Sequence, residues 1–252
     1  MRGFDAATYG ERIAAVYDDW YGEGPDADAT VDAIVSLARG GPVLELGVGT
    51  GRLALPLVAR GVEVHGVDAS PAMVARLSAK PGGDAVRAVI GDFAEVPAAV
   101  PDGFAVVVVA YNTLFNLTSA QAQRRCFATV ARRLRPGGAF VVEAFVPDEG
   151  PLAPTSGVAP SRIETDEVVL TAFRRDPDQQ SVVGSLVSIT ESGIRLHPWQ
   201  IRYAGTAELD AMAHAAGMVV GERWGGWRRE PFTEDSPRHV TVYRAGGGAW
   251  AR

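Results

Sequence analysis

Cysteine and lysine are nearly absent from this chain of 252 residues. Cys126 is the only cysteine, which excludes an intrachain disulfide. Lys80 is the only lysine, and all other basic side chains are arginines. We attribute the rarity of lysine to GC-rich coding and assign no function to it.

Long apolar runs and an excess of positive charge are missing as well. The apolar run at 104–110 is far shorter than the roughly 20 residues that a membrane helix needs. The first residues lack the apolar core of a signal peptide, so we expect a cytoplasmic protein without a membrane partner. The net charge of −6 argues against nucleic acid as a partner, because phosphate binding needs cationic side chains.

What the sequence does contain is a regular alternation of strands and helices. The strands are expected at 42–46, 62–67, 86–90, 104–110 and 139–145, with helices between them, and a helix at 206–216 precedes strands at 218–224 and 239–244. Such an alternation predicts an α/β fold with a doubly wound, mainly parallel sheet and right-handed crossovers. We expect one domain that covers residues 1–252.

Two segments depart from this alternation. Residues 1–40 are expected to form a helical cap, because apolar and aromatic side chains at 8–21 recur every three to four residues and a second helix follows at 28–39. Residues 150–204 are expected to form an antiparallel β insertion. A loop at 150–160 is rich in proline and glycine, and hairpin turns separate three strand-like stretches at 162–174, 181–191 and 194–203.

A glycine loop follows the first strand, at Gly47, Gly49 and Gly51. Glycines between a strand and a helix let the backbone approach a ligand closely. Dinucleotide enzymes place a third glycine one position later, where this chain has Arg52. The acid Glu45 before the loop suits a cationic group better than a pyrophosphate.

Acidic side chains also follow the next two strands. Asp68 ends the second strand, where a carboxylate accepts hydrogen bonds from ribose hydroxyls. Asp92 follows the third strand, beside Phe93, and suits an adenine amino group and ring. Tyr111 and Asn112 follow the fourth strand, at the edge where a donor and an acceptor would meet.

Residues 42–145 resemble the class I methyltransferases that use S-adenosylmethionine and release S-adenosylhomocysteine. The resemblance implies a seven-stranded Rossmann-like sheet with an antiparallel last strand. It also implies Gly47, Gly49 and Gly51 around the methionyl part of the donor, Asp68 at the ribose and Asp92 near the adenine. We expect the rest of the donor site to be formed by Tyr17, Glu45, Arg52, Ala69, Met73, Gly91, Phe93, Ala110, Tyr111 and Asn112.

The motifs Tyr9-Gly10, Tyr17-Asp18, 112–117 and 224–227 are similar to those of the amino-sugar and lincosamide N-methyltransferases of antibiotic biosynthesis. The aromatic stripe of Tyr9, Tyr17 and Trp20 is either a lid over the site or an ordinary core face of a helix, and the likeness favours Tyr9 and Tyr17 for contact with cofactor or substrate. It implies Tyr9, Tyr17 and Phe115 as catalytic residues. The expected acceptor-binding residues are Tyr9, Trp20, Phe115, Asn116, His197, Arg202 and Trp227.

The acceptor itself is not determined by these motifs. No set of side chains has the spacing of a metal site, and the four histidines are scattered. A neutral amine needs no strong base before methylation, whereas a hydroxyl needs a base or a metal. We therefore expect N-methylation of a small amino-bearing acceptor. O-methylation of a sugar or polyketide hydroxyl and a non-catalytic accessory protein are the alternatives, and homo-oligomerisation is left open.

Overall fold

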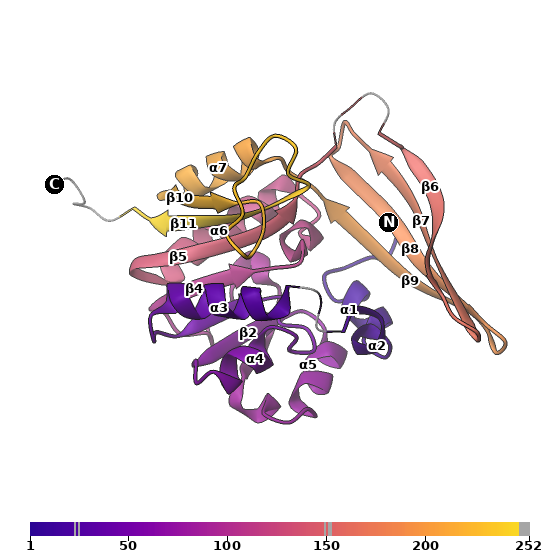
Figure 1. Cartoon of the computed structure of the whole chain (residues 1–252), viewed down its shortest axis with the longest axis horizontal. Helices are drawn as coiled ribbons and strands as arrows, with labels where there is room; N and C mark the ends of the chain where they lie inside the picture. Colours follow the sequence, from indigo (N-terminus) through magenta and orange to yellow (C-terminus); the bar gives the residue numbers. More distant parts are fainter. Residues whose placement is uncertain (23, 25, 149, 151–152, 247–252) are drawn as a thin grey trace.

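A computed structural model describes residues 1–22, 24, 26–148, 150 and 153–246, and all structural statements concern these residues. The main sheet has seven strands in the order β10-β11-β5-β4-β1-β2-β3 (Figure 1). The strands are β1 Val43–Leu46, β2 Val64–Asp68, β3 Arg87–Ile90, β4 Phe104–Val109, β5 Leu134–Phe145, β10 Met218–Trp224 and β11 Arg238–Ala245. Only β11 runs antiparallel to its neighbours β5 and β10, which confirms the predicted fold class.

Helices cover both faces of this sheet. They are α3 Ala27–Ala38, α4 Ala54–Ala59, α5 Pro71–Ser78, α6 Ala120–Arg133 and α7 Thr206–Ala215. Strand β4 is buried on both faces: Val107 and Val109 join the core beneath α6 and α7, and Val106 and Val108 join the core beneath α3 and α4. Two-sided burial explains the nearly unbroken apolar sequence of this strand.

The second sheet is antiparallel and projects from one end of the main fold (Figure 1). It has four strands instead of the expected three: β6 Ser156–Ile163, β7 Glu167–Asp176, β8 Ser181–Thr190 and β9 Gly193–Arg202. The expected loop at 150–160 is therefore wrong for residues 156–160, and residues 151–152 lie outside the described part. Strand β6 tolerates Pro160 because it is an edge strand and because its register shifts between Pro160 and Arg162.

The expected single helix at 8–21 is two short helices. Helix α1 covers Thr8–Ile13 and α2 covers Tyr17–Tyr21, and the chain turns between them. Ile13 and Ala14 are buried at this turn against Met73 of α5, and Leu186 of β8 packs beside them. The two helices thus fill the angle between the main fold and the four-stranded sheet (Figure 1).

Parallel strands end at one edge of the main sheet, and that edge faces α1 and α2. The loops after β1, β2 and β4 meet there, as expected for a ligand site in a doubly wound sheet. None of the helices in the described ranges has the length and apolar character needed to cross a bilayer.

Candidate functional site

The glycine loop after β1 presents bare backbone to a pocket. Gly47 has φ +73° and an added Cβ there would lie 2.3 Å from Cγ2 of Thr113, so only glycine fits. At Gly49, an added Cβ would meet no atom closer than 3.9 Å. The space beside Gly49 is therefore open to a ligand that touches the backbone.

Asp68 holds the loop from the end of β2. Its carboxylate accepts hydrogen bonds from the backbone N–H of Gly49 at 2.8 Å and of Ser70 at 2.8 Å. Burial raises the pKa of Asp68, and these two hydrogen bonds act in the opposite direction. Each carboxylate oxygen keeps a further lone pair, which suits a ligand with hydroxyl donors.

Two adjoining pockets lie beneath α1 and α2. The loop pocket is lined by Phe4, Ala6, Tyr9, Gly10, Tyr17, Gly47, Gly49, Asp68, Ala69, Met73, Phe93, Thr113 and Asn116. The tyrosine pocket is lined by Tyr9, Tyr17, Tyr21, Arg52, Tyr111, Asn112, Glu143, Phe145, Pro237 and Arg238. Tyr9 and Tyr17 line both, so their rings form the shared wall.

The phenol groups of this wall stay protonated. Burial raises the pKa of Tyr17 to about 12 and raises the pKa of Tyr9 well above its ordinary value of 10. Such phenols donate or accept hydrogen bonds at neutral pH but do not act as phenolate bases.

The floor of the tyrosine pocket depends on an unusual turn after β4. Tyr111 and Asn112 both have left-handed backbones, with φ of 56° and 64°. Such conformations cost about 1–2 kcal/mol per residue outside glycine and need compensating contacts. Here the carboxylate of Glu143 accepts from the Tyr111 N–H at 2.8 Å, and the Asn112 side chain accepts from the Phe145 N–H at 2.7 Å.

Arg52 connects the glycine loop with the tyrosine pocket. Its guanidinium carbon lies 3.5 Å from the ring centroid of Tyr111 and 5.9 Å from that of Tyr17. Glu45 lies behind the loop, where burial raises its pKa well above the ordinary value and Arg52 acts in the opposite direction. One Glu45 oxygen, Oε2, is buried without a hydrogen-bond partner.

Several residues expected to bind the donor lie outside both linings. An added Cβ at Gly51 would meet Leu77 and Leu55, so this glycine serves helix packing. Ala110 is buried in the core. Asp92 caps a 3-10 turn, η2 Phe93–Glu95, by accepting from the Ala94 N–H at 2.8 Å. An added Cβ at Gly91 would meet Pro97.

Some residues expected to bind the acceptor also lie outside both pocket linings. Phe115 is fully buried and packs edge-on against Phe145, and Phe145 forms part of the tyrosine pocket instead. Trp227 is buried in the core beneath α3. These two placements have one cause, since large aromatic side chains beside a sheet are buried more readily than exposed.

Trp20 and His197 contact each other rather than the tyrosine pocket. Their rings lie 5.0 Å apart, and the Trp20 indole donates to Glu167 of β7 at 3.2 Å. His197 is buried, and its Nδ1 lies 2.7 Å from the carbonyl oxygen of Arg12. Both side chains join the N-terminal helices to the four-stranded sheet.

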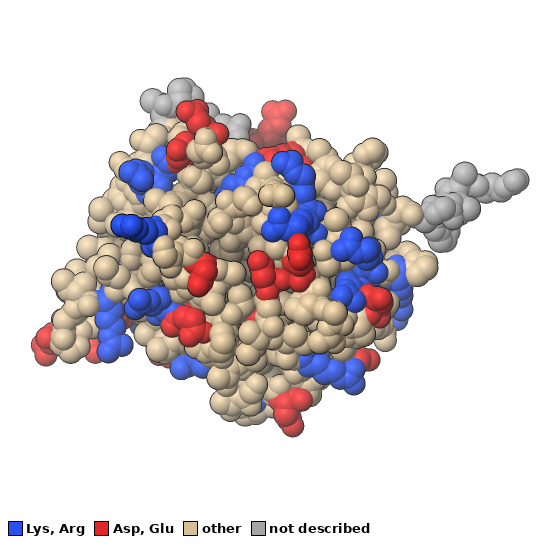
Figure 2. Space-filling view, turned by 180° about the vertical axis from the view of Figure 1, so that it is seen from behind, with Lys and Arg blue, Asp and Glu red and all other residues tan. Residues whose placement is uncertain are grey.

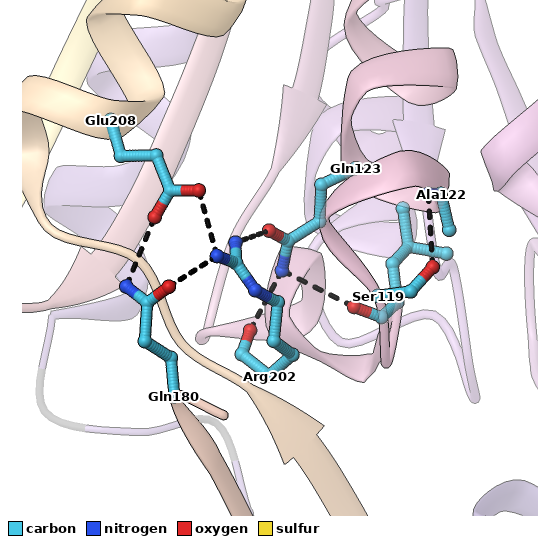
Figure 3. A network of polar contacts seen from close by, with 7 residues as sticks. Ser119, Ala122, Gln123, Gln180, Arg202 and Glu208 are labelled. Atoms are coloured by element: carbon cyan, nitrogen blue, oxygen red, sulfur yellow. Dashed lines mark hydrogen bonds and ion pairs between the residues drawn. The ribbon is translucent and has the colours of Figure 1, made fainter. Parts of the chain in front are cut away.

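Arg202 is also structural in its placement. Its guanidinium donates to Gln123 of α6 at 2.6 Å, pairs with Glu208 of α7 at 2.7 Å and donates to Gln180 (Figure 3). Gln123 returns a hydrogen bond to the Arg202 carbonyl at 2.7 Å. Arg202 is 7% exposed, its contacts fasten the end of β9 to the main fold, and it lies outside both pocket linings.

Other lining residues were not expected from the sequence. Glu143, Phe145 and Arg238 carry no motif, and they reach the tyrosine pocket only because β5 and β11 pair side by side. Phe4 and Ala6 precede the first helix and enter the loop pocket from the N-terminal segment. Thr113 belongs to the motif at 112–117, which follows β4. Its close approach to Gly47 depends on the folded structure and cannot be predicted from spacing alone.

Comparison with known proteins identifies the family. A methyltransferase domain model matches residues 43–138. A cypemycin N-terminal methyltransferase from a Streptomyces species is 30% identical over 206 residues, which cover 81% of this chain and 82% of that protein. The chain belongs to the S-adenosylmethionine-dependent methyltransferases.

Solved structures agree with this methyltransferase assignment. The CcbJ methyltransferase from Streptomyces caelestis is 40% identical, has a TM-score of 0.90, and the match covers 97% of this chain and all of that one. CalS10, an amino pentose methyltransferase from Micromonospora echinaspora involved in calicheamicin biosynthesis, shares the fold at 22% identity and a TM-score of 0.69, over 92% of this chain and 95% of that one. Its structure contains bound S-adenosylmethionine.

The residues of the methyltransferase site fit this cofactor. Open space beside Gly49 admits a ligand against the backbone, and Asp68 offers acceptor lone pairs for ribose hydroxyls. Phe93 and Met73 supply apolar walls in the same pocket. Glu45 lies outside both linings, and its buried Oε2 has no hydrogen-bond partner.

Proposed function

We propose that this methyltransferase methylates an amino nitrogen of a small-molecule acceptor that sits in the tyrosine pocket. The observation that carries the proposal is the shared wall of Tyr9 and Tyr17, which line both pockets and whose pKa values burial raises. A neutral phenol oxygen accepts a hydrogen bond from an amine N–H and orients the nitrogen lone pair, which is the task that an amine acceptor requires.

The chemistry divides between the donor and the chain. S-Adenosylmethionine, when bound, supplies a sulfonium methyl group whose bond to sulfur breaks as the bond to the acceptor nitrogen forms. The protein aligns the two reactants and excludes water, which supplies most of the catalysis when the donor is already activated. The methylated nitrogen becomes a cation that releases a proton once the product reaches solvent, so the site needs no strong internal base.

The donor site that we propose consists of Tyr17, Glu45, Gly47, Gly49, Arg52, Asp68, Ala69, Met73, Phe93, Tyr111 and Asn112. Asn116 also lines the loop pocket and Tyr9 lines both pockets, while Phe145 and Glu143 line the tyrosine pocket in place of the buried aromatic residues.

A relative supports an amine acceptor. The cypemycin enzyme, 30% identical to this chain, is named as an N-terminal methyltransferase and thus acts on an amine. The linings of the two pockets, as far as the structure describes them, include no histidine, the usual general base of a hydroxyl acceptor.

One observation favours a second candidate, O-methylation. Glu143 lines the tyrosine pocket, is 6% exposed and could accept a hydroxyl proton. Against this, one of its oxygens accepts from the Tyr111 N–H and the other lies 3.6 Å from Arg238, so both are engaged.

We also propose the broader setting of this activity. The tyrosine pocket has a volume of about 580 Å³, which suits a small acceptor. Acidic and basic side chains are interspersed on the face shown in Figure 2, which gives little support to nucleic acid as a substrate. A cytoplasmic location and a single structural domain belong to the same proposal.

Labelled S-adenosylmethionine and matched pairs of amino and hydroxy sugars test the proposal. We expect label in the amino compounds only, and a strong loss of turnover with Tyr9→Phe at unchanged donor affinity. Turnover of the hydroxy compounds alone would establish the O-methyl alternative. Donor binding without turnover of any acceptor would favour a non-catalytic accessory role.

A further inference from the structure

The only lysine of the chain joins the N-terminal helices to the glycine loop. Lys80 Nζ donates to the carboxylate of Asp18 in α2 at 2.8 Å and to the carbonyl oxygen of Thr50 at 2.8 Å. The Thr50 hydroxyl donates to the same Asp18 oxygen at 2.6 Å. The Lys80 ammonium and the Thr50 hydroxyl, from separate parts of the chain, thus converge on one carboxylate oxygen.

A second carboxylate docks α1 onto the loop after β2. Glu11 accepts from the Ser70 hydroxyl at 2.7 Å and from the Ala72 N–H at 2.9 Å. An added Cβ at Gly10 would lie 2.4 Å from the Ser70 Cβ, so α1 sits directly on this loop. Thr50 and Ser70 directly follow Gly49 and Ala69, which line the loop pocket, so both docking points adjoin the donor site.

The Asp18 cluster is partly shielded from water, which makes it stronger than a surface ion pair. The side chains of Asp18 and Lys80 are each 30% exposed. Burial alone would raise the pKa of Asp18, but hydrogen bonds from Lys80 and Thr50 outweigh it and leave this pKa lowered. Asp18 therefore stays charged at neutral pH and keeps attracting Lys80.

The type of cation also matters. An ammonium is a compact point charge that donates in several directions, and here it reaches a carboxylate and a carbonyl together. A guanidinium has a wider planar fork and suits a different geometry. Arg76, 3.6 Å from the other Asp18 oxygen, is placed to support the pair without replacing it.

We propose that Asp18, Lys80 and Thr50 form a latch that holds the N-terminal helices closed over the methyl donor and keeps Tyr17 in the shared wall. Asp18 is the neighbour of Tyr17, so the latch fixes the backbone that carries this ring. Tyr9, Gly10 and Tyr17 wall the loop pocket, so the latch must release for donor and product to exchange. Asp18 and Lys80 act as positioning residues.

The inference rests on the donor site and not on the nature of the acceptor. Chemical labelling tests it directly, because Lys80 carries the one side-chain amine of the chain. The full protein is acetylated with a limiting amine-reactive reagent, and mass spectrometry follows Lys80, with a lysine peptide in the same tube as reference. We expect S-adenosylhomocysteine to slow Lys80 acetylation several-fold, and Asp18→Asn to speed it and to abolish the protection.

Variants measure the effect of the latch on the donor. Asp18→Asn and Lys80→Met are each expected to raise the donor dissociation rate about tenfold, with a smaller effect on the acceptor KM. The double variant should resemble either single one, because one interaction is lost in all three. Lys80→Arg should retain part of the effect. Asp32→Asn is the matched control, since it breaks the exposed Arg60–Asp32 pair away from the pockets.

Two results would overturn the latch. One is Lys80 labelling that neither the product nor Asp18→Asn changes. The other is a double variant in which the two substitutions lower thermal stability additively, while its donor dissociation rate equals that of the Asp32→Asn control. Both readouts are independent of acceptor turnover, so they remain decisive if the proposed N-methyl activity fails.

Discussion

At the scale of single residues, Asp68 combines the shaping of the glycine loop with acceptor capacity for a ligand. We predict that Asp68→Asn lowers donor affinity at least about tenfold, because a hydrogen bond to a charged group contributes about 1.5–3 kcal/mol. Titration calorimetry with S-adenosylhomocysteine measures this change. Asp32→Asn, remote from the site, should bind like the unaltered protein, and equal affinities for both variants would remove Asp68 from the donor site.

His239 provides a residue-scale prediction for stability. It is fully buried, and this burial lowers its pKa to about 4. A folded-state pKa below the unfolded value near 6.5 favours the neutral form, so His239 contributes stability above about pH 6.5 that is lost as the pH falls towards 4.

Urea unfolding from about pH 7 down to pH 4 checks this contribution. We expect the free energy of unfolding to fall by up to about 3 kcal/mol over this range through His239. His239→Asn should flatten that part of the curve while lowering stability at pH 7. An unchanged pH dependence in the variant would contradict the assignment.

At the scale of elements, Arg202 fastens the four-stranded sheet to the main fold. We predict that Arg202→Met destabilises the protein by about 2–4 kcal/mol, because Glu208 and two glutamine side chains lose a shared buried partner. Chemical denaturation measures this loss. Arg195→Met, on the exposed part of the same strand, is the control and should change stability little.

Sequence periodicity located most elements, and its failures have physical causes. Strand β4 was predictable because two-sided burial requires an unbroken apolar run. Strand β6 was missed because Pro160 and Gly157 are typical of loops, and an edge strand tolerates both. The helix expected at 8–21 divides at Ala14, a break that depends on packing against α5 and β8 rather than on local propensity.

At the scale of the whole molecule, the sequence predicts those site residues that lie at or just after the end of a single strand. Gly47 and Gly49 lie in the loop after β1 and Asp68 ends β2, so the edge of the parallel sheet brings them together. Glu143, Arg238 and Lys80 depend on strand pairing or helix docking across long separations in the chain. Local spacing contains no signal for such contacts, and amino-acid composition alone assigns no role to Lys80.

The raised pKa values of Tyr9 and Tyr17 lead to a prediction for the pH dependence of turnover. With an amine acceptor, the rate should rise with pH until the amine is neutral and then stay level to about pH 10, because both phenols remain protonated there. Rate measurements across this range, with ultraviolet absorbance to detect phenolate, check the profile. A fall in rate that follows the appearance of phenolate would contradict it.

The central claim, transfer to nitrogen, is tested most directly by an acceptor that offers both choices. An amino sugar with a free amine and free hydroxyl groups is incubated with S-adenosylmethionine labelled with ¹³C in its methyl group, and NMR identifies the atom that bears the label. We predict label on the nitrogen alone. Label on an oxygen, with the amine left unmethylated, would contradict the account.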